Sequence, residues 1–234
     1  MSSFGFRFRQ FFVRHDACAH RVGTDGVLLG AWAKVEGCRR ILDIGTGSGL
    51  IALMAAQRAP EAEVVGIEID AQATRQAQEN AQDSPFADRV HIIRGDVREF
   101  QDEQGFDCIL CNPPFFTEDT LSPDASRALA RHAALLGYED LLMAVRRLLN
   151  DGGIFHVILP YSSCNNFVNQ SFIIGVKVVR YCEIRTVVHR PPKRVLLSLS
   201  SVGSITEERE TLVLQDASGG RSEAYATLTH GFYL

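Results

Sequence analysis

Four consecutive residues near the middle of the chain, Asn112-Pro113-Pro114-Phe115, can together hold a planar amine. A nitrogen conjugated to a ring, or to a carbonyl group, is a poor nucleophile because its lone pair is delocalised. The Asn112 side-chain oxygen and the Pro113 carbonyl can accept its two N–H groups, which orients the lone pair and stabilises charge that develops on nitrogen. The prolines stiffen the turn and lack competing N–H groups, and Phe115 offers a face for stacking. The alternative is a purely structural turn after a strand.

A glycine segment, Gly45-x-Gly47-x-Gly49, follows an apolar run and can bring bare backbone close to a ligand. Glycine permits positive φ angles and leaves no side chain in the way. The spacing differs from the Gly-x-Gly-x-x-Gly of nicotinamide dinucleotide sites, which remain the alternative cofactor class. Asp43 at the end of the preceding strand can hold a ligand ammonium group, directly or through water, but would repel a pyrophosphate.

Two further acids end the next two predicted strands. Glu68 can accept both hydroxyls of a ribose, and Asp96 can accept the amino group of an adenine. With Asp43 they form the predicted cofactor set; the alternative is three solvated acids at strand ends.

Alternating strand and helix patterns from about residue 37 to 160 predict a parallel sheet covered by helices on both faces. The expected strands are Arg40–Ile44, Glu63–Ile69, Val90–Arg94, Phe106–Cys111 and Gly153–Leu159. The expected helices are Val27–Lys34, Leu50–Arg58, Ala71–Gln82 and Tyr138–Leu149. Strands at Val176–Val188 and Val195–Val202, joined by a proline turn, predict an antiparallel hairpin that completes the sheet.

Alternating aromatic residues at the N-terminus, from Phe4 to Phe12, indicate a strand or extended arm. Such aromatics can stack on bases, but we expect them to serve as ordinary strand core. The Cys108-x-x-Cys111 pair lies within a predicted strand, where its side chains point to opposite faces. We therefore expect two buried core residues and no metal site.

The bulk composition predicts one domain without a membrane span. The chain has 234 residues, 46% of them hydrophobic, and a formal net charge of −4. No apolar run reaches the length of a membrane-spanning helix, and the N-terminus lacks the features of a signal peptide. Six scattered cysteines fit reduced thiols in the cytoplasm, and we expect a monomer.

The ordered series of glycine loop, two acids and Asn-Pro-Pro-Phe resembles the class I S-adenosylmethionine-dependent methyltransferases. The resemblance implies an α/β, Rossmann-like fold with a mostly parallel, seven-stranded sheet and S-adenosylmethionine as cofactor. It implies one methyltransferase domain over residues 1–234, with residues 1–36 as a substrate-binding or lid extension and 37–234 as the catalytic core. The tetrapeptide resembles that of enzymes that methylate adenine or guanine amino groups, or glutamine amides. Phe115, where the glutamine enzymes usually have Tyr, favours a nucleobase.

Three further segments resemble one bacterial family, which methylates N6 of the adenine next to the anticodon in a valine tRNA. They are Val22-Gly-Thr-Asp-Gly-Val-Leu-Leu-Gly, the Ser122–His132 region and Arg190-Pro-Pro-Lys-Arg194. The C-terminal Tyr225–Leu234 segment extends the match over nearly the whole chain. The implied partner is the anticodon loop of a tRNA, whose adenine is already single-stranded and therefore easier to place in a pocket.

Several residues are candidates for binding the substrate. Arg131 and His132 fall on a predicted lid over the cleft. Residues 177–194 contain six cations and one Glu, so Arg190, Lys193 and Arg194 are predicted to contact phosphates; the alternative is a solvated hairpin. The turn Thr24-Asp25-Gly26 can meet the carboxylate of the cofactor or wall the cleft, or it can cap the helix Val27–Lys34.

Two rival functions stay open. A protein glutamine methyltransferase, or another nucleobase amino-methyltransferase acting on rRNA guanine or DNA adenine, shares the amine clamp. A catalytically silent binding module or RNA chaperone retains the fold alone, although an intact Asn112–Phe115 segment argues against it.

Overall fold

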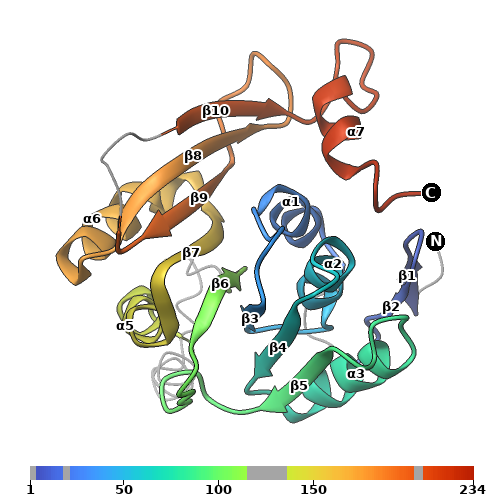
Figure 1. Cartoon of the computed structure of the whole chain (residues 1–234). Coiled ribbons are helices and arrows are strands. Elements are labelled where there is room, and N and C mark those ends of the chain that lie inside the picture. Colours follow the sequence, from blue (N-terminus) through green and yellow to red (C-terminus); the bar gives the residue numbers. More distant parts are fainter. Residues whose placement is uncertain (1–3, 18–21, 115–135, 203–207) are drawn as a thin grey trace, which may run out of the picture.

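The computed structural model describes residues 4–17, 22–114, 136–202 and 208–234. Its large sheet contains eight strands, and a two-stranded hairpin lies beside it (Figure 1). In spatial order the strands are β10 (Glu208–Val213), β8 (Lys177–Arg185), β9 (Arg194–Ser200), β7 (Leu149–Pro160), β6 (Phe106–Cys111), β3 (Arg40–Ile44), β4 (Glu63–Glu68) and β5 (Val90–Arg94). The described helices are α1 (Thr24–Trp32), α2 (Leu50–Arg58), α3 (Ala71–Gln82), α5 (Tyr138–Leu148), η2 (Tyr161–Ser163), α6 (Cys164–Ile174) and α7 (Glu223–Thr229).

The sheet is mostly parallel, as predicted. Strands β7, β6, β3, β4 and β5 pair in parallel, whereas β9 pairs antiparallel with both β7 and β8. The expected hairpin is therefore confirmed, but the expected count of seven strands is wrong. Strand β10 adds an eighth by pairing in parallel with β8. Four of its six residues, from Glu208 to Thr211, are exposed, so an edge strand of this kind carries no apolar pattern.

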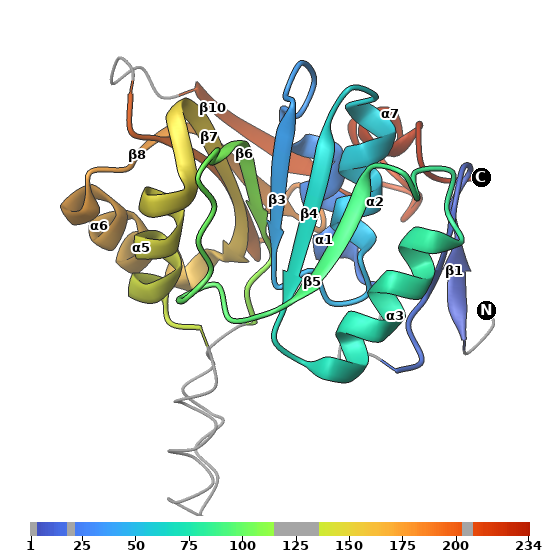
Figure 2. The ribbon, with the colours of Figure 1, turned by 60° about the horizontal axis from the view of Figure 1, so that its bottom comes forward.

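Helices cover both faces of the sheet (Figure 2). Helices α1, α2 and α3 lie on one face, and α5 and α6 lie on the other. A hydrophobic core lies on each face of the sheet: the first core under α1, α2 and α3, and the second core under α5 and α6. Successive strand residues alternate between them, so Ile41 belongs to the first core and Leu42 to the second. Cys108 and Cys111 are both buried, one in each core, which confirms that they are core residues on opposite faces of the sheet.

Helix α1 begins three residues earlier than predicted, with Gly23 as its N-cap. The interpretation of Thr24 as a helix cap is therefore wrong. Gly26 and Gly30 lie one turn apart on the helix face that packs against α2. A Cβ atom on Gly30 would lie 2.7 Å from the sulfur of Met54. The glycines thus allow the two helices to pack closely. From the sequence alone, glycines that permit close packing cannot be distinguished from glycines that form a turn.

The expectation that the N-terminal aromatics form strand core holds only in part, because Phe4 is 65% exposed and Phe6 and Phe12 are half-buried. They lie in and around a hairpin of β1 (Gly5–Arg7) and β2 (Phe12–Arg14), and Phe8 and Phe11 are fully buried. The C-terminal tail covers this hairpin: Arg9 donates its backbone N–H to the Phe232 carbonyl at 2.9 Å. The two ends of the described chain consequently lie near one another (Figure 1).

Candidate active site

The glycine loop follows β3 and leads directly into α2. Gly45, Gly47 and Gly49 have φ angles of 67°, 55° and 81°, a region that disfavours residues with a side chain. A Cβ atom on Gly45 would meet nothing within 4 Å, and one on Gly47 would meet only the Gly45 carbonyl. Backbone conformation, not packing, therefore requires these two glycines, and the space beside them is open to a ligand.

Asp43 lies beneath this loop and is fully buried. Its Oδ2 accepts hydrogen bonds from the Thr46 hydroxyl at 2.6 Å and from the Ala52 N–H at 3.1 Å. Burial raises the pKa of its carboxyl group to about 7, against the opposing effect of these two donors. Asp43 does not line the cavity beside the loop, but its Oδ1 has no partner among the described residues. It braces the loop and can reach a ligand ammonium group only through an intervening group such as water.

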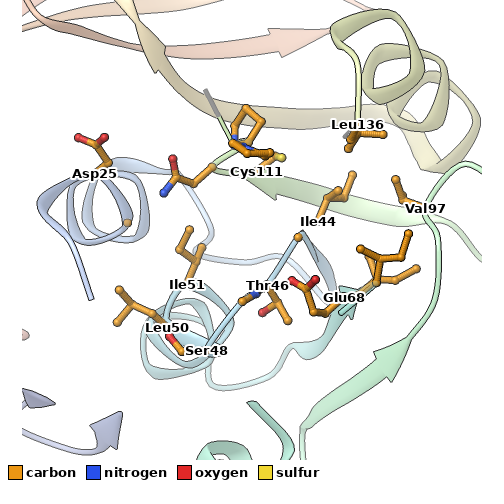
Figure 3. A pocket seen from close by; sticks show the side chains of 18 of the residues that line it. Asp25, Ile44, Thr46, Ser48, Leu50, Ile51, Glu68, Val97, Cys111 and Leu136 are labelled. Carbon is orange, nitrogen blue, oxygen red and sulfur yellow. Dashed lines mark hydrogen bonds between the residues drawn. The ribbon is translucent and has the colours of Figure 1, made fainter. Parts of the chain in front are cut away.

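A cavity of about 640 Å³ opens at the carboxyl ends of the parallel strands. We call it the glycine-loop cavity; the loops after β3, β4, β5 and β6 and the start of α1 line it. Figure 3 shows Asp25 on one side and Glu68 and Val97 on the other. Its size is that of a typical cofactor or ligand pocket, and its position is where open parallel sheets bind ligands.

Glu68 at the end of β4 joins two loops. Its Oε2 accepts the Gly47 N–H at 2.9 Å, and its Oε1 accepts the Asp70 N–H at 2.9 Å. Because each carboxylate oxygen has two lone pairs, both can accept a further hydrogen bond from a ribose hydroxyl. The carboxylate lines the cavity, as the prediction requires.

Asp96 also lines the cavity, but it is paired with a cation that sequence analysis missed. Its Oδ1 accepts from the Arg98 backbone N–H at 2.9 Å and from Arg98 Nε at 3.0 Å. The Arg98 guanidinium, bound to this carboxylate, holds its pKa below the usual range. An adenine amino group must therefore share Asp96 with Arg98. The two residues are only two positions apart, so the Asp96-x-Arg98 spacing was the local signal that could have revealed the pair.

Asn112 and Pro113 follow β6 and line the same cavity as the glycine loop and Glu68. The Asn112 side-chain oxygen is buried, and no described residue donates a hydrogen bond to it. A buried carbonyl oxygen without a donor is costly, which suits an acceptor reserved for a ligand. Phe115, Arg131 and His132 lie outside the described residues.

Cys111 precedes Asn112 and also lines the cavity. Burial raises the pKa of its thiol, and the nearby Asp43 and Glu68 carboxylates raise it further. The side chain is therefore a neutral, apolar part of the wall.

The chain matches the family model described as the methyltransferase small domain over residues 23–173, which is more than half of its length. It belongs to this family. Curated relatives match along nearly their whole length. A protein of Bacteroides thetaiotaomicron, named tRNA1(Val) (adenine(37)-N6)-methyltransferase, is 43% identical over 98% of this chain and 97% of its own. A protein of the same name from Yersinia enterocolitica is 43% identical over 98% and 92%.

Solved structures resemble this methyltransferase in fold. A predicted O-methyltransferase from Agrobacterium tumefaciens has a TM-score of 0.67 at 18% identity, and the match covers 89% of this chain and 96% of that one. TrmN from Thermus thermophilus has a TM-score of 0.55 at 24% identity, over 76% and 48% of the two chains. At these identities the likeness establishes the Rossmann-like fold alone.

Thr24 and Asp25, the first residues of α1, line the glycine-loop cavity of this methyltransferase. Asp25 belongs to the turn that was expected to wall the cleft, but no contact was predicted for its carboxylate. Its Oδ2 accepts a hydrogen bond from Arg194 Nε at 2.8 Å, so the predicted phosphate-binding arginine is tied to the start of α1.

The structure divides the predicted basic segment of the methyltransferase. Arg180 pairs with Glu210 at 2.7 Å, and Arg185 pairs with Glu183 at 2.9 Å. In the register of β8 with β9, Lys177 lies opposite Ser200 and Ile184 lies opposite Arg194. Lys177 is therefore at the end of β8 that is remote from Arg194. Lys193 and Arg194 lie together beside the site, in the wall of a second cavity. Arg185 also reaches this turn, because its guanidinium donates to the Arg190 carbonyl at 3.2 Å, but its charge is already paired with Glu183.

Arg14 does not extend this cationic group, and Arg9 is bound to the C-terminal tail, where its Nε donates to the Tyr233 carbonyl at 2.6 Å. Arg14 pairs with Glu79 and Asp83 of the α3 region. Hairpin β1–β2 and strand β8 lie at opposite sides of the molecule in both ribbon views.

The described part of the methyltransferase lacks two kinds of feature. Within it, no three His, Cys, Asp or Glu side chains gather so as to hold a metal ion. Nor do its helices include one whose length and apolar character suit a crossing of the bilayer.

Proposed function

We propose that the chain is an S-adenosylmethionine-dependent tRNA methyltransferase that modifies N6 of adenine 37 in a valine tRNA, the reaction for which its full-length relatives are named. The observation that carries the proposal is the buried, unpaired Asn112 oxygen in the wall of the glycine-loop cavity. The cytoplasm, where tRNA is modified, is the proposed compartment, and a monomer is the proposed state.

The residues of the glycine-loop cavity fit a cofactor that carries positive charge. Of the charged residues that the structure describes, Asp25, Glu68, Asp96 and one cation, Arg98, line it, and the Asp43 oxygen that lacks a described partner lies behind the loop. Glu68 is proposed to hold the ribose, the backbone of Gly45 and Gly47 to lie against the ligand, and Asp96 to hold the adenine. Thr24 closes the opposite wall. When bound, S-adenosylmethionine supplies an electrophilic methyl group.

Asn112 and Pro113 are proposed to bind the acceptor. The Asn112 side-chain oxygen and the Pro113 carbonyl each accept one N–H of the adenine amino group. Two acceptors in fixed positions turn the nitrogen lone pair out of conjugation and stabilise the charge that grows on nitrogen. Phe115 is proposed to stack on the base, and Arg131 and His132 to contact the substrate.

The RNA is proposed to approach over Arg190, Lys193 and Arg194. Among the described residues, no carboxylate pairs with Arg190 or Lys193, so both are available for phosphate. A chain of net charge −4 binds nucleic acid through a local group of this kind, not through its overall charge.

The decisive experiment offers the purified protein labelled S-adenosylmethionine and valine tRNA transcripts with adenine or guanine at position 37. Label should enter only the adenine transcript, and nucleoside mass spectrometry should identify it as N6-methyladenosine. Equal labelling of both transcripts, or of neither, would overturn the proposal. Labelling of a glutamine-containing protein substrate instead would support the glutamine methyltransferase.

A further inference from the structure

A second cavity, of about 410 Å³, adjoins the glycine-loop cavity. We call it the C-terminal cavity; its lining includes Lys193, Arg194, Gln215, Arg221 and Tyr225. Thr24 and Asp25 line both cavities, so the start of α1 forms the boundary between them. One ligand can therefore extend from one cavity into the other past these two residues.

The two cavities have opposite charge. Among the described residues, three carboxylates and one cation line the glycine-loop cavity. The described lining of the C-terminal cavity holds three cations, Lys193, Arg194 and Arg221, and one carboxylate, Asp25. The first suits a cationic cofactor, whereas the second suits an anion.

The cations of the C-terminal cavity are held in place by different contacts. Arg194 is bound to Asp25 at 2.8 Å, and the Arg221 guanidinium lies 4.2 Å from the centre of the Tyr233 ring. Neither Lys193 nor Arg221 has a carboxylate partner within the described ranges. An ammonium and a guanidinium group thus remain to bind an anion.

Backbone hydrogen bonds tie the C-terminal wall to the end of β8. Leu214 donates its N–H to the Arg185 carbonyl at 2.8 Å, and Gln215 donates to the Thr186 carbonyl at 2.9 Å. The Asp216 carboxylate accepts the Gly220 N–H at 3.0 Å, which closes the turn before Arg221. Tyr225, at 8% exposure, forms a buried part of the wall. The cavity is therefore formed before any ligand binds.

We propose that the C-terminal cavity binds the phosphodiester next to the target adenosine, together with the neighbouring nucleotide. The inference rests on the proposed function, since it requires a base in the glycine-loop cavity. A nucleotide chain carries its charge on the phosphates and not on the base. The neutral base then lies in the acidic glycine-loop cavity, and the negatively charged phosphate lies in the basic C-terminal cavity. Each part of the nucleotide is thus in an environment that suits its charge. Lys193 and Arg221 bind the phosphate, and the Asp25–Arg194 pair separates the two sites.

The test combines protein variants with RNA that lacks one charge. Lys193→Gln and Arg221→Gln are compared with the wild type for binding to an anticodon stem-loop, with S-adenosylhomocysteine present. The RNA is either unmodified or carries a neutral methylphosphonate at one linkage on the 5′ or 3′ side of the target. Arg39→Gln is the matched control, because Arg39 is exposed and precedes β3, at the amino ends of the parallel strands and therefore away from the cavities at their carboxyl ends.

Each cavity variant should weaken binding of unmodified RNA about tenfold and reduce the salt slope by about one. Affinity for S-adenosylhomocysteine should not change. When the neutral linkage is at the contacted phosphate, the wild-type protein should lose about as much affinity as each variant loses for unmodified RNA. The variants, which already lack this contact, should bind the neutral RNA nearly as well as they bind unmodified RNA. If Arg221→Gln disturbs the packing of Tyr233, the result for Lys193→Gln decides the test.

The inference would be overturned if the losses of affinity caused by the variant and by the neutral linkage simply added, at both the 5′ and the 3′ linkage. It would also be overturned if the control variant weakened RNA binding as much as the cavity variants do. If the wild-type protein methylates tRNA and the penalties are additive, this inference alone fails. If the wild-type protein neither binds nor methylates the RNA, the proposed function fails with it.

Discussion

Gly47 donates its backbone N–H to the Glu68 carboxylate at 2.9 Å, although 21 residues separate the two in sequence. The bond joins the glycine loop after β3 to the end of β4. It therefore makes the shape of the loop depend on an acid that also faces the proposed cofactor. Disturbing Glu68 should affect both.

Glu68→Gln should raise the dissociation constant for S-adenosylhomocysteine about tenfold to a hundredfold. A glutamine has one carbonyl oxygen, so it cannot accept from both Gly47 and Asp70, and its amide nitrogen faces one of the two donors. Calorimetric titration measures the change. Glu63→Gln, at the exposed start of the same strand, is the control. Equal affinities in the two variants would show that Glu68 has no part in the cofactor site.

Asn112→Ala should lower kcat about a hundredfold to a thousandfold, as loss of one preorganised hydrogen-bond partner does elsewhere. Affinity for S-adenosylhomocysteine should stay within about twofold. Thermal stability should not fall, because the change removes a buried oxygen that has no described donor. Single-turnover methylation and a melting curve provide the two measurements.

The control for this variant is Asn165→Ala, an exposed amide on α6. It should retain both activity and stability. Methylation by Asn112→Ala at the wild-type rate would remove the carboxamide from the proposed chemistry.

Asp43→Asn should change how stability depends on pH. Burial raises the pKa of Asp43 to about 7 from 3.8, so the folded protein holds a proton that the unfolded chain releases between these values. The free energy of unfolding contributed by Asp43 therefore falls as pH rises from about 4 to about 7, by at most about 4 kcal/mol. Asparagine does not titrate. Urea unfolding at several pH values should thus give a wild-type curve that declines relative to the variant.

Other titrating groups cancel in this comparison. Burial lowers the pKa of His156 to about 3, which makes stability fall with acidification in both proteins alike. Parallel curves for wild type and Asp43→Asn would show that Asp43 titrates normally.

Phe232→Ala should destabilise the protein by about 3–5 kcal/mol. Phe232 is 3% exposed and packs in the first core, and its carbonyl accepts the Arg9 N–H. The tail that carries Tyr233, and with it the Arg221 contact, depends on this anchor. Leu234→Ala, two residues later and 84% exposed, should have little effect. A loss of stability no larger than that of the control would mean that the tail does not contribute to the folded core.

The strands and helices around the glycine loop were predictable because their signals are local. Strands β3, β5 and β6 and helices α2 and α3 have the predicted bounds. Each is a short apolar or periodic segment bounded by Gly, Pro or Asp, and burial on both faces of a parallel sheet enforces that pattern. By contrast β10, α6 and α7 were missed, because an edge strand and surface helices require no distinct apolar pattern.

Residue types and order alone indicated an amine clamp, a glycine loop and acids at successive strand ends, because parallel strands bring their carboxyl ends to one edge. Tertiary structure decided which of these groups face the cavity. It put Asp43 behind the loop, paired Asp96 with Arg98, and placed Asp25 and Arg221 in cavity walls. Asp96 with Arg98, and Asp43 with Thr46, are local contacts whose geometry the folded loops fix. The positions of Asp25 and Arg221 depend instead on segments far apart in the chain: Asp25 is bound to Arg194, and Arg221 lies on Tyr233 in a tail that packs on Arg9. Local periodicity carries no information about such contacts, since they form only when the whole core has packed.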